Sequence, residues 1–160
     1  MAYNLDRNKG KVSDIKQNIE NKKSELKDLE KNKENLLEAG MEVQNSEIDE
    51  EVQKTIMEQI NQALEANAEE GDKLADDMNS DAKDLEDMKQ ETQESVQSNI
   101  EERTSLEKKQ TILEKFGLGN KLDSAISELD DNKVQLEEFN QSLIETSQEV
   151  DKVSQELRAL

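Results

Sequence analysis

The chain has 160 residues, of which 31% are hydrophobic, 38% charged and 2% aromatic, and its 21 basic against 40 acidic side chains leave a net charge of −19. It has no Cys, His, Pro or Trp, which excludes disulfide frameworks, Cys/His zinc sites and Ser-His-Asp or Cys-His catalysis. The acidic excess argues against nucleic acid as a partner, and the scarcity of aromatic and β-branched residues argues against a β-sandwich or barrel. The structural classes that remain are a disordered chain and a protein of long helices.

The first segment carries the hydrophobic spacing of a packed helix. Two interleaved series of period seven run from Leu5 to Leu36, and most of their positions are apolar. A sustained repeat of this kind predicts a helix over about residues 5–39 that packs on another helix. Gly40 is the expected left-handed residue at its end, and Ser46 with an acid three residues later is the expected start of the next helix.

The middle segment has a thinner apolar stripe and predicts a helix over about residues 47–116. Its pattern slips by one position at Val96 and Ile100, which is typical of a stutter in the repeat. Gly71 costs about 1 kcal/mol in a helix interior relative to Ala. Asn79 could cap a new helix, so the middle helix is expected either to continue or to break near one of these two residues.

The last segment has the strictest repeat and predicts a helix over about residues 120–160. Aliphatic residues stand seven apart from Leu122 to Leu157 without exception. Gly117 is expected to close the preceding helix while Leu118 folds back on it, and Gly119 to let the last helix begin. A GxG without a preceding strand is not a phosphate loop. Phe116 is expected to act as a local cap at the helix end, and an exposed aromatic residue for recognition at this turn is the alternative.

These elements predict an all-α protein, a single helical coiled-coil module over residues 1–160. The two outer helices are expected to fold back on the middle one as an elongated antiparallel coiled coil of three long helices. The alternative is a compact four-helix bundle with a break near Gly71 or Asn79. Charge favours antiparallel pairing of the first helix with the middle one, because residues 1–40 carry a net charge of +1 and residues 41–100 a net charge of −14.

The sequence offers no convincing site for chemistry. Asp77, Asn79 and Asp81 match the first ligand positions of an EF-hand loop, but Ala82 stands where Gly is needed and Met88 where Glu is needed. A catalytic carboxylate pair needs a pocket that shifts one pKa, and thin helices with one apolar seam offer none. We therefore expect no enzyme activity, cofactor, metal or small-molecule substrate.

The heptad faces predict an interface instead. They exceed what one thin middle stripe can cover, so a helical protein partner or a second copy of the chain is expected to complete the core. No run is long enough to span a membrane. The interface candidates are the seam residues Ile15, Ile19, Leu26, Leu29, Leu122, Leu129, Leu136 and Leu143; the turn candidates are Phe116, Gly117, Leu118 and Gly119.

An acidic helical region without Pro or Cys, broken at glycine turns, resembles the N-terminal delivery regions of Gram-positive polymorphic toxins of the LXG and WXG classes. Phe116-Gly117-Leu118-Gly119 stands at the helical turn, and Arg7 stands where an acid would complete a Tyr-x-x-x-Asp/Glu export signal from Tyr3. The resemblance implies a secretion or delivery module that pairs with small helical proteins.

The ends of the sequence bear on where such a module would act. The chain begins with Met and has no cleavable signal peptide, and its last heptad ends on Leu160 without a cap. We therefore expect the N-terminal part of a longer chain, made in the cytoplasm and exported by a specialised secretion system. An intracellular coiled-coil scaffold or spacer, and an acidic regulatory module that binds a basic protein, are the alternatives.

Overall fold

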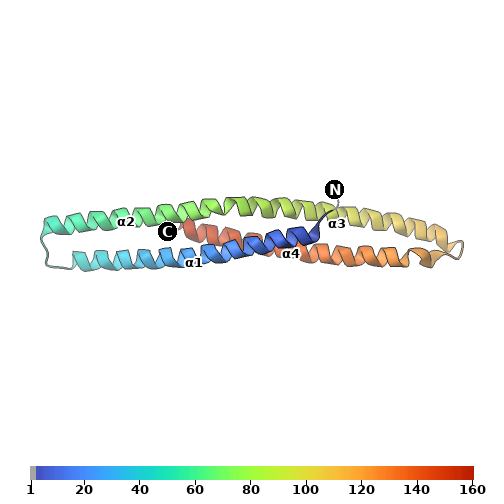
Figure 1. Ribbon diagram of the computed structural model, residues 1–160, viewed down its shortest axis with the longest axis horizontal. Helices are drawn as coiled ribbons and strands as arrows, with labels where there is room; N and C mark the ends of the chain where they lie inside the picture. The colour runs from blue at the N-terminus through green and yellow to red at the C-terminus, as the bar shows by residue number, and fades with distance from the viewer. Residues whose placement is uncertain (1–2) are drawn as a thin grey trace. The chain divides into compact units, whose positions relative to one another are not determined.

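The computed structural model describes residues 3–160, and helices account for 91% of them, with no strand in this part of the chain (Figure 1). The all-α prediction is therefore confirmed. There are three long helices, the middle one bent. The elements are α1 (Leu5–Gln44), α2 (Glu50–Asp77) and α3 (Asn79–Glu114) of the bent middle helix, the 3-10 turn η1 (Gly119–Leu122), and α4 (Asp123–Arg158).

The predicted end of the first helix is wrong. Helix α1 continues through Gly40 to Gln44, and a Cβ built on Gly40 would lie 3.6 Å from the Met57 Cε of α2. This is an ordinary van der Waals distance, so Gly40 is a buried helical residue facing α2 rather than the left-handed residue of a helix end. The start of α2 is capped by Asp49, whose carboxylate accepts the Glu51 N–H at 3.2 Å. The Ser46 hydroxyl instead donates to the Val43 carbonyl at 2.6 Å.

The middle helix bends at Met78, next to the predicted break at Asn79, while Gly71 lies inside α2. Met78 keeps right-handed angles (φ −80°, ψ −12°), and the Ala82 N–H donates to its carbonyl at 3.0 Å, so the helical path continues. The expected stutter at Val96 and Ile100 is absent, because the inward series keeps steps of seven through the bend. Its members are Leu64, Gly71, Met78, Leu85, Thr92 and Asn99, with Asn99 buried and Ile100 37% exposed.

The predicted turn after the middle helix is confirmed. Gly117 has φ 73° and is the one residue with positive φ in the described chain. The Leu118 N–H donates to the Leu113 carbonyl at 2.9 Å and the Gly117 N–H to the Glu114 carbonyl at 3.1 Å. These two bonds are the Schellman pattern that satisfies the last carbonyls of a helix.

Contacts along the chain group into two compact units. Unit 1 comprises Met1–Ser13, of which residues 3–13 are described, with Lys83–Ser147; unit 2 comprises Asp14–Ala82 with Gln148–Leu160. Within each unit two antiparallel helices are joined by a loop and receive a segment of the third long helix (Figure 1). Helices α1 and α4 therefore each contribute to both units.

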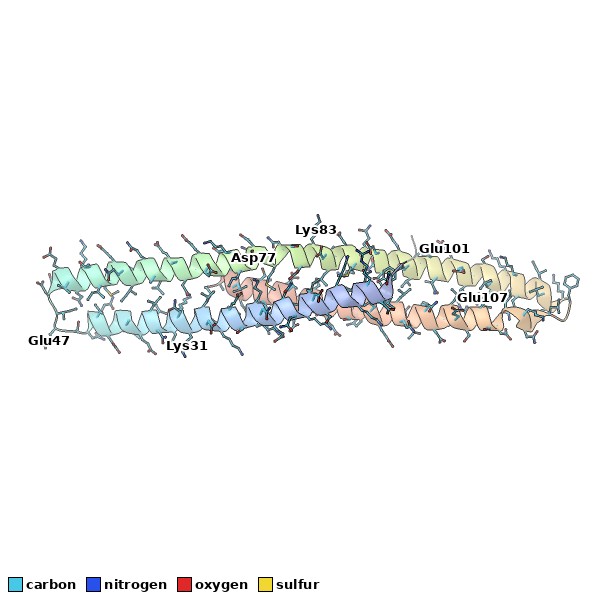
Figure 2. All side chains as sticks on the ribbon, in the orientation of Figure 1. Lys31, Glu47, Asp77, Lys83, Glu101 and Glu107 are labelled. Atoms are coloured by element: carbon cyan, nitrogen blue, oxygen red, sulfur yellow. The ribbon has the colours of Figure 1, made fainter. Side chains whose placement is uncertain are left out.

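The core of each unit is aliphatic and follows the heptad seams. In unit 2, Ile19 and Leu157 are completely buried, as is Leu143 in unit 1. Burying a side chain of this size contributes about 1.5–3 kcal/mol, so a few such layers stabilise helices whose surfaces are otherwise charged. Figure 2 shows Lys31, Lys83 and Glu101 pointing away from the helices. No helix in the described residues is both long enough and apolar enough to cross a membrane.

Candidate functional site

The predicted interface seams lie inside the folded chain. Five of the eight candidates are buried, and the other three, Leu29, Leu122 and Leu129, are half-buried. Each unit packs segments of three helices, so a side chain that two helices would leave open is covered by the third. The prediction of an open interface is therefore wrong for the buried residues Ile15, Ile19, Leu26, Leu136 and Leu143.

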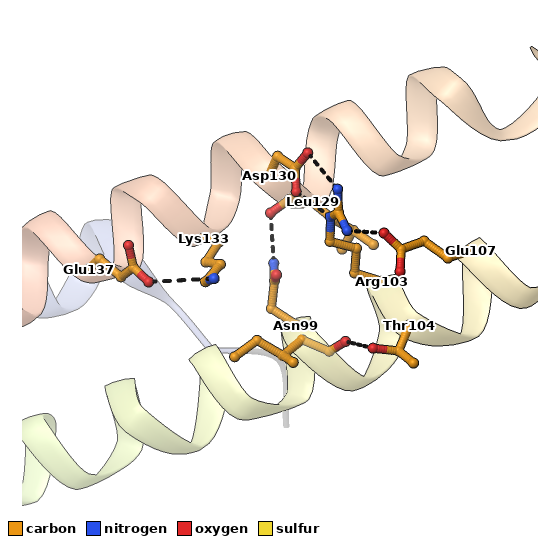
Figure 3. Close-up of polar contacts among 9 residues, drawn as sticks. Asn99, Arg103, Thr104, Glu107, Leu129, Asp130, Lys133 and Glu137 are labelled. Carbon is orange, nitrogen blue, oxygen red and sulfur yellow. Dashed lines mark hydrogen bonds and ion pairs between the residues drawn. The ribbon is translucent and has the colours of Figure 1, made fainter.

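In unit 1, polar side chains hold α3 against α4 (Figure 3). The buried Asn99 donates through Nδ2 to the Leu129 carbonyl at 2.9 Å. One turn further on, Arg103 Nε donates to Asp130 Oδ1 at 2.5 Å and Nη2 donates to Oδ2 at 3.3 Å, while Glu107 contacts the same guanidinium. The hydrogen bond to Asp130 raises the pKa of Arg103 above its usual value, so the clamp keeps its charge.

Unit 2 contains a corresponding buried amide. Asn67 of α2 donates through Nδ2 to the Leu29 carbonyl of α1 at 3.0 Å, and its Oδ1 accepts from Asn32 at 2.9 Å. Lys23 of α1 donates to Glu149 of α4 at 2.5 Å, and this hydrogen bond raises the Lys23 pKa above its usual value. These contacts join helices and fix their register; they do not assemble a reactive pair.

A groove in unit 2 is the first surface with the features of a binding site. The segment of α4 in this unit covers α1 and α2 over only the part far from their loop (Figure 1). Nearer the loop, Leu37 is 49% exposed and Met41 is 58% exposed. We name this the Leu37 groove, about 540 Å³ in volume and lined by Glu30, Lys33, Glu34, Leu37, Glu38, Met41, Glu156, Ala159 and Leu160.

The Leu37 groove has an apolar floor and an acidic rim. Glu30, Glu34, Leu37 and Met41 are spaced four, three and four residues apart, so they share one face of α1. The one basic side chain, Lys33, donates to the Leu160 carbonyl at 3.1 Å and so is already engaged. The surface can therefore bury apolar groups and attract cations around them.

The second exposed surface is the turn between α3 and α4. Phe116 is 74% exposed, Ile112 is 57% exposed and Leu118 is 43% exposed, although Phe and Leu are usually buried. Lysines flank all three. We name residues 108–121 the Phe116 turn. Of the four predicted turn residues, Phe116, Gly117 and Leu118 are exposed and Gly119 is half-buried against Glu114; the exposure of Leu118 differs from the expectation that its side chain folds back on the preceding helix.

The acidic residues singled out for metal binding do not form a site. Within residues 3–160, no group of three or more Asp and Glu side chains is placed to hold a metal ion. Asp77 contacts Lys22 at 3.7 Å, and Asn79 begins α3. No protein-family model, curated protein or solved structure matches the chain.

Leu37 and Met41 were not among the predicted interface residues. The heptad seam takes Leu36, which leaves its neighbour Leu37 one position off the seam, on a face that two packed helices do not cover. An apolar residue directly beside a seam residue is the signal that could have found this groove. The position of α4 alongside it could not be read from the sequence.

Proposed function

We propose that this protein is a non-enzymatic helical interaction module that binds an amphipathic helix of a partner in the Leu37 groove. The observation that carries the proposal is a half-exposed apolar floor, Leu37 and Met41, lying next to the end of a packed helix and ringed by carboxylates. A helix with apolar residues at i, i+3, i+4 and i+7 suits such a groove, which is the usual helix-in-groove mode.

The same proposal extends to the internal packing. The unbroken steps of seven support pairing of the helices in each unit as antiparallel coiled coils. In a coiled coil a third helix adds to an existing seam, so a partner helix would repeat in the Leu37 groove what α4 does further along α1. Fully burying Leu37 and Met41 would contribute about 1.5–3 kcal/mol each.

The rim predicts the partner's polar face. Glu30, Glu34, Glu38 and Glu156 surround the floor, and Lys33 is engaged. A basic amphipathic helix therefore fits, and charge complementarity of this kind chiefly raises the association rate and the specificity. This joins the helical-partner and basic-partner predictions into a single proposal.

The test is binding of two synthetic peptides measured by fluorescence anisotropy. Both carry the same leucine stripe, one with a lysine-rich and one with a glutamate-rich polar face. We expect the basic peptide to bind and the double variant Leu37→Ser, Met41→Ser to weaken it by at least about tenfold, since each loses burial worth over 1 kcal/mol.

The matched control is Ile100→Ser with Val134→Ser, which removes two exposed apolar side chains from unit 1. If the control variant weakens binding as much as the groove variant, nonspecific contact with exposed apolar side chains explains the result; if neither variant weakens it, attraction to the net charge does. The groove proposal fails in both cases. Light scattering on the chain without peptide tests a second copy as occupant; a dimer abolished by the groove variant would replace the peptide partner with the protein itself.

A role as the delivery region of a larger exported effector stays a prediction. A neighbouring toxin domain in the complete gene product, together with export of that product, would support it.

A further inference from the structure

The Phe116 turn combines features that the groove proposal does not use. Ile112 lies on one face with Lys108 and Lys115, at spacings of four and three, and also with Lys109 and Phe116, at spacings of three and four. All five side chains are exposed. Within residues 108–121 there are four lysines and one acid, Glu114, a local net charge of +3 in a chain of net −19.

The acids nearest this turn are occupied by neighbouring groups. Glu107 pairs with Arg103, and Asp123 accepts a hydrogen bond from Gln110 Nε2 at 2.5 Å. Glu114 packs its stem against Gly119. Among the described residues, none of the four lysines of the turn, Lys108, Lys109, Lys115 and Lys121, is in an ion pair.

The turn is also held in shape. The Schellman bonds fix Gly117 and Leu118, and Gln110 Nε2 donates to the Gly119 carbonyl at 2.8 Å. Phe116 and Leu118 are therefore presented outward by a fixed backbone, so binding would cost little ordering of this backbone.

The loop between α1 and α2 provides an internal comparison. It exposes apolar side chains too, Met41, Ile48 and Val52, but residues 34–53 contain no basic residue. Glu47 stands in the loop itself (Figure 2), followed by Asp49, Glu50 and Glu51. The pairing of exposed apolar groups with lysines is thus a property of the Phe116 turn rather than of loops in this chain.

We propose that the Phe116 turn docks on an anionic membrane surface, inserting Phe116 and Leu118 between headgroups while the lysines bind lipid phosphates and carboxylates. Aromatic and aliphatic side chains are stable at the headgroup boundary, and long lysine side chains reach from there to the anionic headgroups. The net charge does not prevent this, because at physiological salt charges beyond about 8 Å are largely screened. With the flanking acids Glu107 and Asp123 included, residues 103–123 hold five basic and three acidic residues, a local net charge of +2.

A single tryptophan makes the docking visible, since the chain has none. Phe116→Trp keeps an aromatic ring in the turn, and Ile48→Trp places the same reporter in the acidic loop. The probes are vesicles of phosphatidylcholine with phosphatidylserine, and vesicles of phosphatidylcholine alone. We expect the Phe116→Trp emission to shift to the blue only with the anionic vesicles, and the Ile48→Trp emission to stay unchanged with both.

Charge and apolar contact are separated by two further pairs, measured by vesicle sedimentation of the unlabelled chain. Lys108→Glu, Lys109→Glu and Lys115→Glu together should lower binding by about a hundredfold, because each lysine near an anionic surface is worth about fivefold. Lys16→Glu, Lys27→Glu and Lys31→Glu change the net charge equally on α1 and should have little effect. Phe116→Ser with Leu118→Ser should abolish binding, while Ile48→Ser with Val52→Ser should not.

Circular dichroism verifies that every variant keeps its helices. The proposal is overturned if the wild-type chain sediments with neither kind of vesicle. Phe116 would then insert into a pocket of another protein instead of a membrane surface. It is equally overturned if the α1 lysine variant loses as much binding as the turn variant. Because groove binding is measured with peptides and without lipid, failure here leaves the proposed function standing.

Discussion

At the residue scale, two buried asparagines each join a pair of helices, but within residues 3–160 only one of them has a hydrogen-bond partner for its amide oxygen. Asn67 and Asn99 each donate to a leucine carbonyl on the facing helix, Leu29 and Leu129. The Asn67 Oδ1 also accepts from Asn32, whereas the Asn99 Oδ1 is buried without a hydrogen-bond partner among the described residues. An unpaired buried acceptor costs about 1–3 kcal/mol. Both asparagines fix the register of the helices they join. Asn99 lowers the free energy of unfolding more than Asn67 does, because its oxygen is unpaired in the part of the chain that the structure describes.

Asn99→Leu is expected to stabilise the protein more than Asn67→Leu. The first breaks one hydrogen bond, to the Leu129 carbonyl, but also removes an unpaired acceptor, while the second breaks two hydrogen bonds for the same gain in apolar burial. We expect a difference of about 1–2 kcal/mol in the free energy of unfolding, measured by urea denaturation monitored by circular dichroism. Equal effects, or the opposite order, would mean that the Asn99 oxygen is satisfied in solution.

The sequence did not indicate the burial of Asn99. Ile100 is the more hydrophobic neighbour, and a pattern based on hydrophobicity selects it. The fixed step of seven from Leu85 through Thr92 overrides that preference and places the amide inside. Register is a property of the whole helix, so one residue's polarity could not reveal it.

At the element scale, a glycine inside a helix either permits close packing or only lowers helix stability, depending on whether another segment lies beside it. A Cβ built on Gly71 of α2 would lie 2.5 Å from the Leu157 carbonyl oxygen and 2.8 Å from Leu160 Cδ1 of the neighbouring chain segment. Gly10 of α1 has nothing within 4 Å of its built Cβ. Gly71 thus permits a close approach within unit 2, whereas Gly10 only weakens its helix.

Gly10→Ala should therefore raise and Gly71→Ala should lower the free energy of unfolding. The first change gains about 0.5–1 kcal/mol of helix propensity. The second would gain the same propensity, but the methyl group meets a backbone atom that must move, and overpacking costs about 1–3 kcal/mol. Thermal unfolding of both variants tests this; a stabilised Gly71→Ala protein would show that the segment ending at Leu160 is not held against α2.

The helices and the Phe116 turn could be predicted from the sequence, whereas the turn at Gly40 could not. Gly117 is followed by an apolar residue, Leu118, which is the sequence pattern of a Schellman motif, although the Leu118 side chain itself is 43% exposed. Gly40 has the same residue type but lies inside α1 with α2 at ordinary contact distance, and Gly71 lies inside α2 at a true close approach. Glycine alone does not distinguish a helix end from a close approach.

At the scale of the whole molecule, neither unit is a continuous piece of sequence. Unit 2 needs residues 148–160, where Val150, Val153 and Leu157 are at most 2% exposed, and unit 1 takes in the start of α1. This arrangement covers the seams that two helices would leave open. The heptads predicted that the seams are buried; which chain segment buries them depends on how far the outer helices extend, and that could not be read from their lengths alone.

Replacing Val150, Val153 and Leu157 with Ser should unfold unit 2 or nearly so. Three lost burials amount to about 6 kcal/mol, which is comparable to the total stability of many domains. The control, Asp151→Ser with Lys152→Ser and Gln155→Ser, changes three exposed residues of the same stretch. Hydrogen exchange should show protection lost in residues 14–82 for the first variant and kept for the second. Protection retained in both would refute the three-segment core.

Each unit is built from two separate segments of the sequence, and this also determines when it can fold during synthesis of the chain. Paired side chains lie far apart in sequence: 89 residues separate Tyr3 from Thr92, and 126 separate Lys23 from Glu149. Helical proteins usually fold fast because their contacts are local. Here residues early in the sequence must wait for their partners, and Lys23 can meet Glu149 only after residue 149 has left the ribosome. Until then the nascent α1 and α2 have one face uncovered, and binding by another protein competes directly with α4.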